Sequence, residues 1–220
     1  MKTDALVIFD CDGVLVDSER LSVGIEAHLL TQMGVPHSEL DVVNTFMGRS
    51  AGAGKAVLER LLGKAGAAEF DSRSTAEIHA AFDRDLTPIP GIPEVLDSLR
   101  QSGWRTCVAS SGSHQKMQRT LGLTGLYDFF QGRIFSAADV AHGKPAPDLF
   151  LQAAQVMGAE PDACVVVEDS VPGVQAGIAA GMRVYGFTGG LAPEGALQAA
   201  GALVLECMKH LPTALMDWRR

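Results

Sequence analysis

Two carboxylates stand two residues apart near the start of the chain, in the stretch Phe9-Asp10-Cys11-Asp12-Gly13. They follow an apolar run, 5–9, which predicts a fully buried strand. Buried like charges this close repel each other unless a cation lies between them, and Mg²⁺ prefers carboxylate and carbonyl oxygens. At the carboxyl end of a central strand, these residues would form part of a ligand site. The alternative is a solvated turn, because Asp-Gly is a common turn signal.

Two further polar groups follow predicted buried strands. Ser110-Ser111-Gly112-Ser113 comes after the run 105–109, and its hydroxyls and amides could hold an anion such as phosphate. Glu168-Asp169-Ser170 comes after the run 164–167 and could complete a metal site. Either group could instead simply cap the helix that follows it, because serine and aspartate are common N-caps.

A single lysine stands in the segment Lys144-Pro145-Ala146-Pro147-Asp148, where two prolines stiffen the loop. A fixed ammonium group there could neutralise a phosphate or a nucleophilic carboxylate. The alternative is a solvated surface lysine.

The elements that must position these groups alternate between strands and helices in the second part of the chain. Helices are predicted at 92–102, 115–121, 148–157 and 171–180, and strands at 105–109, 134–135, 164–167, 183–187 and 202–205. This alternation predicts a mainly parallel sheet with helices on both faces. All the polar strand ends would then lie at one edge of the sheet.

The segment between the first strand and this αβ part contains only helical patterns. Helices are predicted at 18–34, 38–46, 52–62 and 75–85, and the Ala/Gly-rich stretch 63–68 is predicted to form helix ends and loops. Such a block indicates an inserted helical domain, with hinges near 16–18 and 85–90.

Composition limits the class of protein. The chain has 220 residues, 47% of them hydrophobic, which is enough for one core and a smaller appended domain. A formal net charge of −8 argues against a nucleic-acid partner. The four cysteines lack metal-site spacing and indicate free thiols of a reducing compartment. No run is long enough to span a membrane and no signal-peptide pattern is present, so we expect a cytoplasmic protein.

The order of these motifs resembles the four motifs of the haloacid dehalogenase superfamily over nearly the whole chain. The string Phe-Asp-x-Asp-Gly-Val-Leu-Val-Asp-Ser-Glu resembles its nucleophile motif. Lys-Pro-x-Pro-Asp and Val-Glu-Asp-Ser-x-x-Gly resemble the branch that contains β-phosphoglucomutase, phosphoglycolate phosphatase and sugar-phosphate phosphatases. The resemblance implies an α/β fold, with a Rossmann-like core of parallel strands at 1–17 and 88–220 and an all-helical cap domain at 18–87.

The resemblance also implies roles for individual residues. Asp10 would be the nucleophile that forms an aspartyl-phosphate, and Asp12 the general acid and base. Ser110 and the Ser111 amide would bind the transferred phosphoryl group, which Lys144 would neutralise. Mg²⁺ would be held by an Asp10 carboxylate oxygen, the Asp12 carbonyl and Asp169, with Glu168 close by or linked through water.

The same resemblance favours a phosphatase over a mutase. The mutase has a histidine soon after its first motif, and the matching position here is Ser22. Without that histidine, water should hydrolyse the phosphoenzyme. In the helical domain, Arg49 is the candidate contact for a substrate carboxylate or hydroxyl groups, and the alternative is a solvated arginine.

We therefore expect a Mg²⁺-dependent phosphatase that acts on a small phosphorylated metabolite, such as a sugar or sugar-acid phosphate. The alternatives are a β-phosphoglucomutase-like enzyme or a phosphoglycolate phosphatase. A non-enzymatic scaffold is disfavoured by the intact acidic residues. A monomer or weak homodimer is expected.

Overall fold

The computed structural model describes residues 5–46 and 51–219 of the chain. These residues form two compact units, one made of residues 5–17 with 87–219 and one made of residues 18–46 with 51–86. We call them the sheet unit and the helical unit. Thr87 therefore belongs with the sheet unit, next to the boundary expected from the sequence.

The sheet unit is built on one sheet of six parallel strands in the order β3-β2-β1-β4-β5-β6. The strands are β1 (Leu6–Phe9), β2 (Arg105–Ser110), β3 (Ile134–Ser136), β4 (Cys164–Glu168), β5 (Arg183–Phe187) and β6 (Leu203–Leu205). Strand β1 lies at the centre, with Ile8 level with Cys107 on one side and Val166 on the other. The α/β, Rossmann-like class predicted from the sequence is confirmed.

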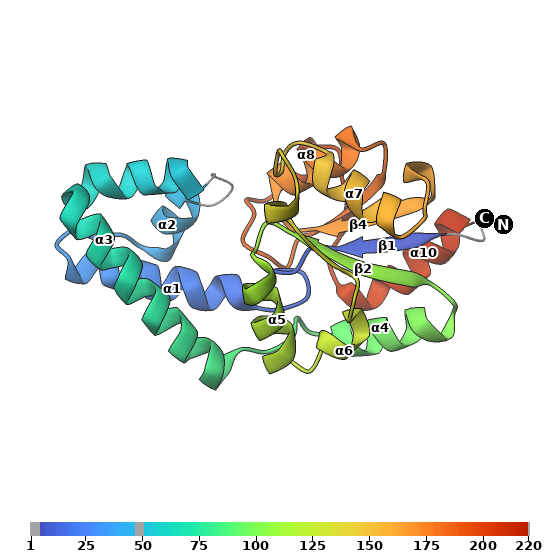
Figure 1. Cartoon of the computed structure of the whole chain (residues 1–220), viewed down its shortest axis with the longest axis horizontal. Helices are drawn as coiled ribbons and strands as arrows, with labels where there is room; N and C mark the ends of the chain where they lie inside the picture. The colour runs from blue at the N-terminus through green and yellow to red at the C-terminus, as the bar shows by residue number, and fades with distance from the viewer. Residues whose placement is uncertain (1–4, 47–50, 220) are drawn as a thin grey trace. The chain divides into compact units, whose positions relative to one another are not determined.

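Helices cover both faces of this sheet (Figure 1). One face carries α7 (Asp148–Val156) and α8 (Val171–Ala179), and α9 (Ala196–Ala199) lies near the end of the sheet that β5 and β6 form. The other face carries α4 (Ile92–Gln101), α5 (His114–Leu123), α6 (Tyr127–Phe130) and α10 (Leu211–Arg219). The sequence analysis missed α6, α9 and α10, of which α6 and α9 have only four residues and give little periodic signal.

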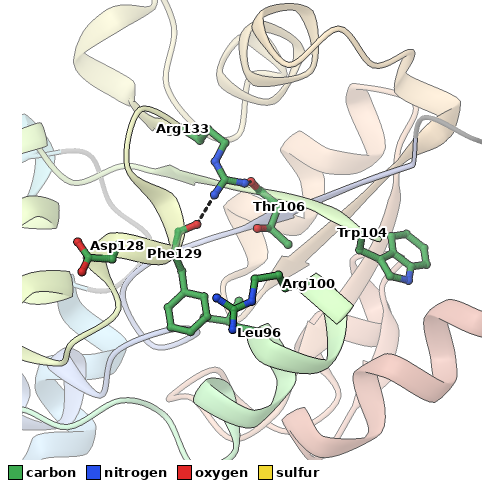
Figure 2. Close-up of a pocket in the computed structure, with 7 residues that line it drawn as sticks. All are labelled: Leu96, Arg100, Trp104, Thr106, Asp128, Phe129 and Arg133. Carbon is green, nitrogen blue, oxygen red and sulfur yellow. Dashed lines mark hydrogen bonds between the residues drawn. The ribbon is translucent and has the colours of Figure 1, made fainter. Parts of the chain in front are cut away.

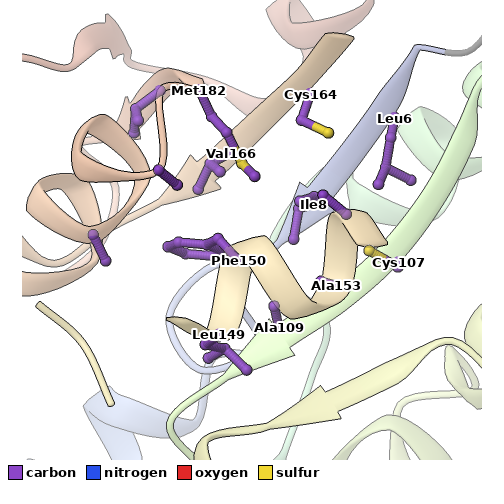
Figure 3. Close-up of a cluster of buried hydrophobic side chains, with 14 of the residues drawn as sticks. Leu6, Ile8, Cys107, Ala109, Leu149, Phe150, Ala153, Cys164, Val166 and Met182 are labelled. Carbon is purple, nitrogen blue, oxygen red and sulfur yellow. The ribbon is translucent and has the colours of Figure 1, made fainter. Parts of the chain in front are cut away.

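The core beneath α7 explains why the central strands read as continuous apolar runs. Figure 3 shows Leu149 and Phe150 of α7 among side chains of β1, β2 and β4. Both residues, like the strand residues Leu6 and Ile8, are fully buried. Strands covered on both faces need no polar alternation, so every residue of β1 is apolar.

The helical unit contains α1 (Ser18–Gln32), α2 (Glu39–Phe46) and α3 (Ala51–Asp85). The prediction of a loop across 63–68 was wrong for most of that stretch. Only Gly63 departs from helical geometry, with φ 71° and ψ 168°, and the chain is helical again from Lys64 onward. Alanine is a strong helix former, so the Ala/Gly composition was a weak loop signal there.

No helix among the described residues is long and apolar enough to cross a membrane.

Candidate active site

The sheet brings three polar strand ends to one edge. Asp10 directly follows β1, Ser110 ends β2 and Glu168 ends β4. Because β1, β2 and β4 are adjacent and parallel, their carboxyl ends lie side by side. The backbone amide of Asp10 still donates to the Val167 carbonyl at 3.0 Å, so the sheet geometry continues up to this carboxylate.

Lys144 joins two of these strand ends through its buried ammonium group. Its Nζ lies 2.5 Å from Asp10 Oδ1 and 2.6 Å from Glu168 Oε1, and it donates to the Ala109 carbonyl at 3.1 Å. The Lys144 side chain is only 4% exposed and also lies over the Phe150 ring, 4.9 Å from its centroid. The solvated-lysine alternative is therefore wrong, and the loop before α7 delivers a fixed positive charge to the strand ends.

Burial and charge act against each other at this group. Burial raises the pKa of Asp10 to about 7, against the attraction of Lys144 and together with repulsion from Glu168 and Asp12. Burial alone would lower the pKa of Lys144, but the carboxylates of Asp10 and Glu168 outweigh it and raise that pKa above its usual range. Lys144 is therefore a permanent cation beside a carboxyl that titrates near neutrality.

Glu168 is held from both sides. Its Oε1 accepts from Lys144, while its Oε2 accepts from the backbone amides of Asp169 and Ser170 at 3.0 and 2.9 Å and from the Ser170 hydroxyl at 2.8 Å. Ser170 also caps α8 by accepting from the Gly173 amide. The helix-cap alternative thus holds for Ser170, while Glu168 faces Lys144.

The loop after β2 brings Ser110 beside Asp12. A Cβ atom on Gly112 would lie 3.6 Å from Asp12 Oδ2 and 3.7 Å from Ser110 Oγ, so both side chains meet at this glycine. The Gly112 amide donates to Ser110 Oγ at 3.2 Å, and the Gly112 carbonyl accepts from Ser136 at 2.7 Å. It is Ser113, not Ser110, that caps α5, so the capping alternative does not account for the buried Ser110.

Lys116 is a site residue that the sequence analysis missed. Its Nζ lies 2.8 Å from Asp12 Oδ2, with the Asp12 side chain 15% exposed. Lys116 lies in the first turn of α5, three residues after the cap Ser113. A lysine one helical turn beyond a strand-end serine loop was the signal that could have found it.

The balance of charges at the strand ends is compatible with one divalent cation. Asp10, Asp12, Glu168 and Asp169 supply four carboxylates against the two ammonium groups of Lys144 and Lys116, which leaves two negative charges when all are ionised. Among the described residues no group of three or more His, Cys, Asp or Glu side chains is placed so that it could hold a metal ion. Mg²⁺ needs none, because it is usually bound by one or two carboxylates and several waters.

Other predicted residues lie elsewhere or outside the described part of the chain. Arg49 falls in the segment 47–50, outside the described residues. Ser111 is exposed. In the helical unit, Ser22 Oγ donates to the Ser18 carbonyl of its own helix at 2.9 Å.

The helical unit has a hollow of its own, of about 360 Å³. Phe46, Leu58 and Phe70 supply apolar walls, and Lys55 is its basic group. The sequence analysis did not identify this hollow.

The chain was compared with known families and proteins. The family model described as haloacid dehalogenase-like hydrolase matches residues 5–181. The 6-phosphogluconate phosphatase of Escherichia coli K12 is 32% identical over 182 residues, covering 82% of this chain and 81% of the relative. The phosphorylated carbohydrates phosphatase of Thermotoga maritima is 32% identical over 201 residues, covering 90% of this chain and 92% of the relative.

A solved structure shares this fold. A HAD family hydrolase of Deinococcus radiodurans R1, determined with bound phosphate and sodium, superposes with a TM-score of 0.82 at 32% identity, covering 98% of this chain and 96% of that one. The family match spans the strand ends that carry Asp10, Ser110 and Glu168 and the loop that carries Lys144. This chain therefore belongs to the haloacid dehalogenase-like hydrolase family.

Proposed function

We propose that this protein is a Mg²⁺-dependent phosphatase of small sugar or sugar-acid phosphates that works through an aspartyl-phosphate on Asp10. Its family and its two phosphatase relatives already identify it as a phosphatase. The proposal adds the substrate class, the metal and the role of each residue.

The observation that carries the proposal is the buried ammonium group of Lys144 between Asp10 and Glu168. Phosphoryl transfer needs little from a protein beyond a positioned nucleophile and positive charge around the transferred group. Lys144 provides that charge and also fixes the nucleophile. Within the described residues, Oδ1 of Asp10 accepts a hydrogen bond from Lys144, and Oδ2 has no hydrogen bond.

In the first step, Oδ2 of Asp10 attacks phosphorus as the bond between phosphorus and the ester oxygen breaks. The leaving alkoxide takes a proton from Asp12, so the alcohol departs neutral and the phosphoryl group remains on Asp10. Ser110 lies beside Asp12 at Gly112 and would donate its hydroxyl to a phosphoryl oxygen.

In the second step, water attacks the same phosphorus and gives a proton to Asp12 while the bond to Asp10 breaks. Inorganic phosphate leaves and both carboxyls return to their starting states. Lys116 would hold the Asp12 side chain in place, because its Nζ lies 2.8 Å from Asp12 Oδ2. Lys116 is a positioning residue because it acts through Asp12.

Magnesium would be held by an Asp10 carboxylate oxygen, the Asp12 carbonyl and the Asp169 carboxylate. When bound, the cation neutralises charge on the phosphoryl oxygens. The oxygens of Glu168 accept from Lys144, from two backbone amides and from Ser170. This supports the expectation that Glu168 acts beside the metal or through water rather than as a direct ligand.

The substrate class rests on the relatives, whose names specify 6-phosphogluconate and phosphorylated carbohydrates. We propose that the helical unit selects among such esters as a cap, with Arg49 as a candidate contact. We also predict a reducing, cytoplasmic setting, which the four free cysteines support. A monomer or weak homodimer stays a prediction.

The proposal is tested by phosphate release from a panel of sugar phosphates, sugar-acid phosphates and phosphoglycolate, with Mg²⁺ and with a chelator. We expect metal-dependent release from a few of these esters. Asp10→Asn should abolish release, while Asp162→Asn, which changes an exposed carboxylate outside the site, should not.

Two results would count against the proposal. Conversion of a sugar phosphate to its isomer without phosphate release would identify a mutase. Full release by Asp10→Asn would remove Asp10 as the nucleophile.

A further inference from the structure

A second pocket lies in the sheet unit, away from the strand ends that carry the candidate active site. It has a volume of about 190 Å³ (Figure 2). Seven residues from α4, α6 and the starts of β2 and β3 line it: Leu96, Arg100, Trp104, Thr106, Asp128, Phe129 and Arg133. Thr106 stands four residues before Ser110 on β2, which places the two sites about 13 Å apart along the strand.

The hydroxyl of Thr106 is the first feature that points to a ligand. Thr106 is only 8% exposed, and it lines the pocket. Within the described residues its hydroxyl has no hydrogen-bond partner, although its backbone carbonyl accepts from Arg133. The hydroxyl oxygen keeps access to solvent through the pocket, so it can bond to water or to a ligand that enters there.

Two guanidinium groups supply positive charge around that hydroxyl. Arg133 donates to the Thr106 carbonyl at 2.8 Å and to the Phe129 carbonyl, which uses two of its five N–H donors. Arg100 lies over the Phe129 ring, 5.5 Å from its centroid, and pairs with Asp97 at 2.7 Å. Figure 2 shows the Arg100 guanidinium beside the Phe129 ring and below Thr106.

The charge and size of the pocket define the ligand class. Two arginines and one aspartate line it, which gives the lining one net positive charge, and Asp97 outside the lining pairs with Arg100. Asp128 and Trp104 lie at opposite ends of the group in Figure 2, leaving the arginines and Thr106 between them. A volume of about 190 Å³ accommodates a small ligand such as an oxyanion.

We propose that this pocket is a binding site for a small oxyanion, either a phosphate or a short carboxylate. One oxygen would accept from the Thr106 hydroxyl and others from the guanidinium groups, which match carboxylates and phosphates equally well. The aromatic walls of Trp104 and Phe129 would cover the remainder of the ligand. This site is separate from the catalytic one and does not depend on the proposed function.

Tryptophan fluorescence can test the proposal because the chain has two tryptophans, and one of them lines the pocket. Trp104 stacks on Trp218 with ring centroids 6.0 Å apart. The full-length protein would be titrated with inorganic phosphate and, separately, with lactate. We expect a saturable change in emission, and the probe that binds more tightly decides between a phosphate and a carboxylate.

Three variants locate the binding. Thr106→Val removes the hydroxyl but keeps the β-branched shape of the side chain, and should weaken binding about tenfold. Thr106→Ser keeps the hydroxyl and should bind like the parent. Arg100→Gln removes one guanidinium group from the pocket and should also weaken binding. The variant should fold normally, because Arg100 is exposed and its loss leaves no buried group unpaired.

Calorimetry with the same probes measures binding independently of fluorescence. The proposal is overturned if neither method detects binding that depends on Thr106, or if Thr106→Val and Arg100→Gln bind as tightly as the parent. Product inhibition by phosphate at the catalytic site should be unchanged in Thr106→Val. That control separates the two sites.

Discussion

At the scale of single residues, Asp10 has an environment that favours its neutral form when no metal is bound. It is buried beside Glu168 and Asp12, whose charges raise its pKa further, and Lys144 acts in the opposite direction. Ionisation of Asp10 therefore destabilises the folded protein. Binding of a cation would relieve that cost, which links metal affinity to the form that attacks phosphorus.

Asp10→Asn should therefore make the metal-free protein more stable while abolishing turnover. The pKa of Asp10 rises from 3.8 to about 7 on folding, so the parent loses stability as pH rises through that range, and the neutral asparagine does not. At pH 8 with a chelator, we expect the variant to unfold at least about 2–4 °C higher, the shift that 1 kcal/mol produces in a chain of this size.

The pH dependence is the sharper part of this test. The advantage of the variant should shrink as pH falls from 7 toward 4, because Asp10 of the parent then takes up a proton. Thermal unfolding of Glu206→Gln, which changes an exposed carboxylate, serves as the control and should follow the parent at every pH. If the variant were less stable than the parent at pH 8, ionised Asp10 would not be destabilising the folded protein.

Lys116→Gln tests the ion pair with Asp12. Without the ammonium group, the Asp12 carboxylate loses its 2.8 Å partner. We expect kcat to fall about tenfold, part of the 10²–10⁴ that a positioned acid and base supplies, with KM changing far less. Lys116→Arg should restore much of kcat. A change in KM alone would instead place Lys116 in substrate binding.

At the scale of elements, the approach of α8 to the end of β4 depends on a glycine. A Cβ atom on Gly173 would lie 1.8 Å from Glu168 Oε1. The first turn of α8 therefore packs directly against the carboxylate that accepts from Lys144. Because glycine has no Cβ atom, the first turn of the helix can approach the carboxylate this closely.

Gly173→Ala should displace Glu168 and weaken its bond to Lys144. We expect a loss of about 1–3 kcal/mol in the free energy of unfolding, typical of overpacking, together with lower kcat. Denaturant unfolding and steady-state kinetics measure the two effects.

Gly122→Ala is the matched control for that substitution. Gly122 is a helical glycine of α5 whose added Cβ would meet nothing within 4 Å. Alanine there should stabilise the protein slightly. Equal losses in both variants would show that the contact with Glu168 is not the cause.

At the scale of the whole molecule, burial divides the four cysteines. Cys11, Cys107 and Cys164 are buried, and Cys207 is partly exposed. Burial raises the pKa of the Cys11 and Cys107 thiols above the usual range, and nearby carboxylates raise that of Cys11 further. A buried thiol that remains protonated reacts slowly.

A thiol reagent should therefore label one cysteine rapidly in the folded protein and four after denaturation. Mass spectrometry should locate the rapid label on Cys207. Rapid labelling of Cys107 in the folded state would contradict the packing of β2 between β1 and β3. The parent protein and Cys207→Ser form the matched pair, and the variant should show no rapid label.

The sequence by itself determined the sheet, its order of βα units and the residues at its edge. Apolar strands followed by Asp10, Ser110 and Glu168 had to expose those ends at one edge, because parallel strands all point the same way. It also determined the insertion of a helical unit after the first strand. These properties follow from local periodicity and chain direction.

Only the tertiary structure decided which polar groups meet. The two carboxylate partners of Lys144 lie 134 and 24 residues away from it in the chain. Lys116 and its partner Asp12 are 104 residues apart. No local pattern encodes such separations. The pocket proposed to bind an oxyanion likewise joins α4, α6 and the starts of two strands, so the place of the Thr106 hydroxyl in it becomes visible only once these elements are packed together.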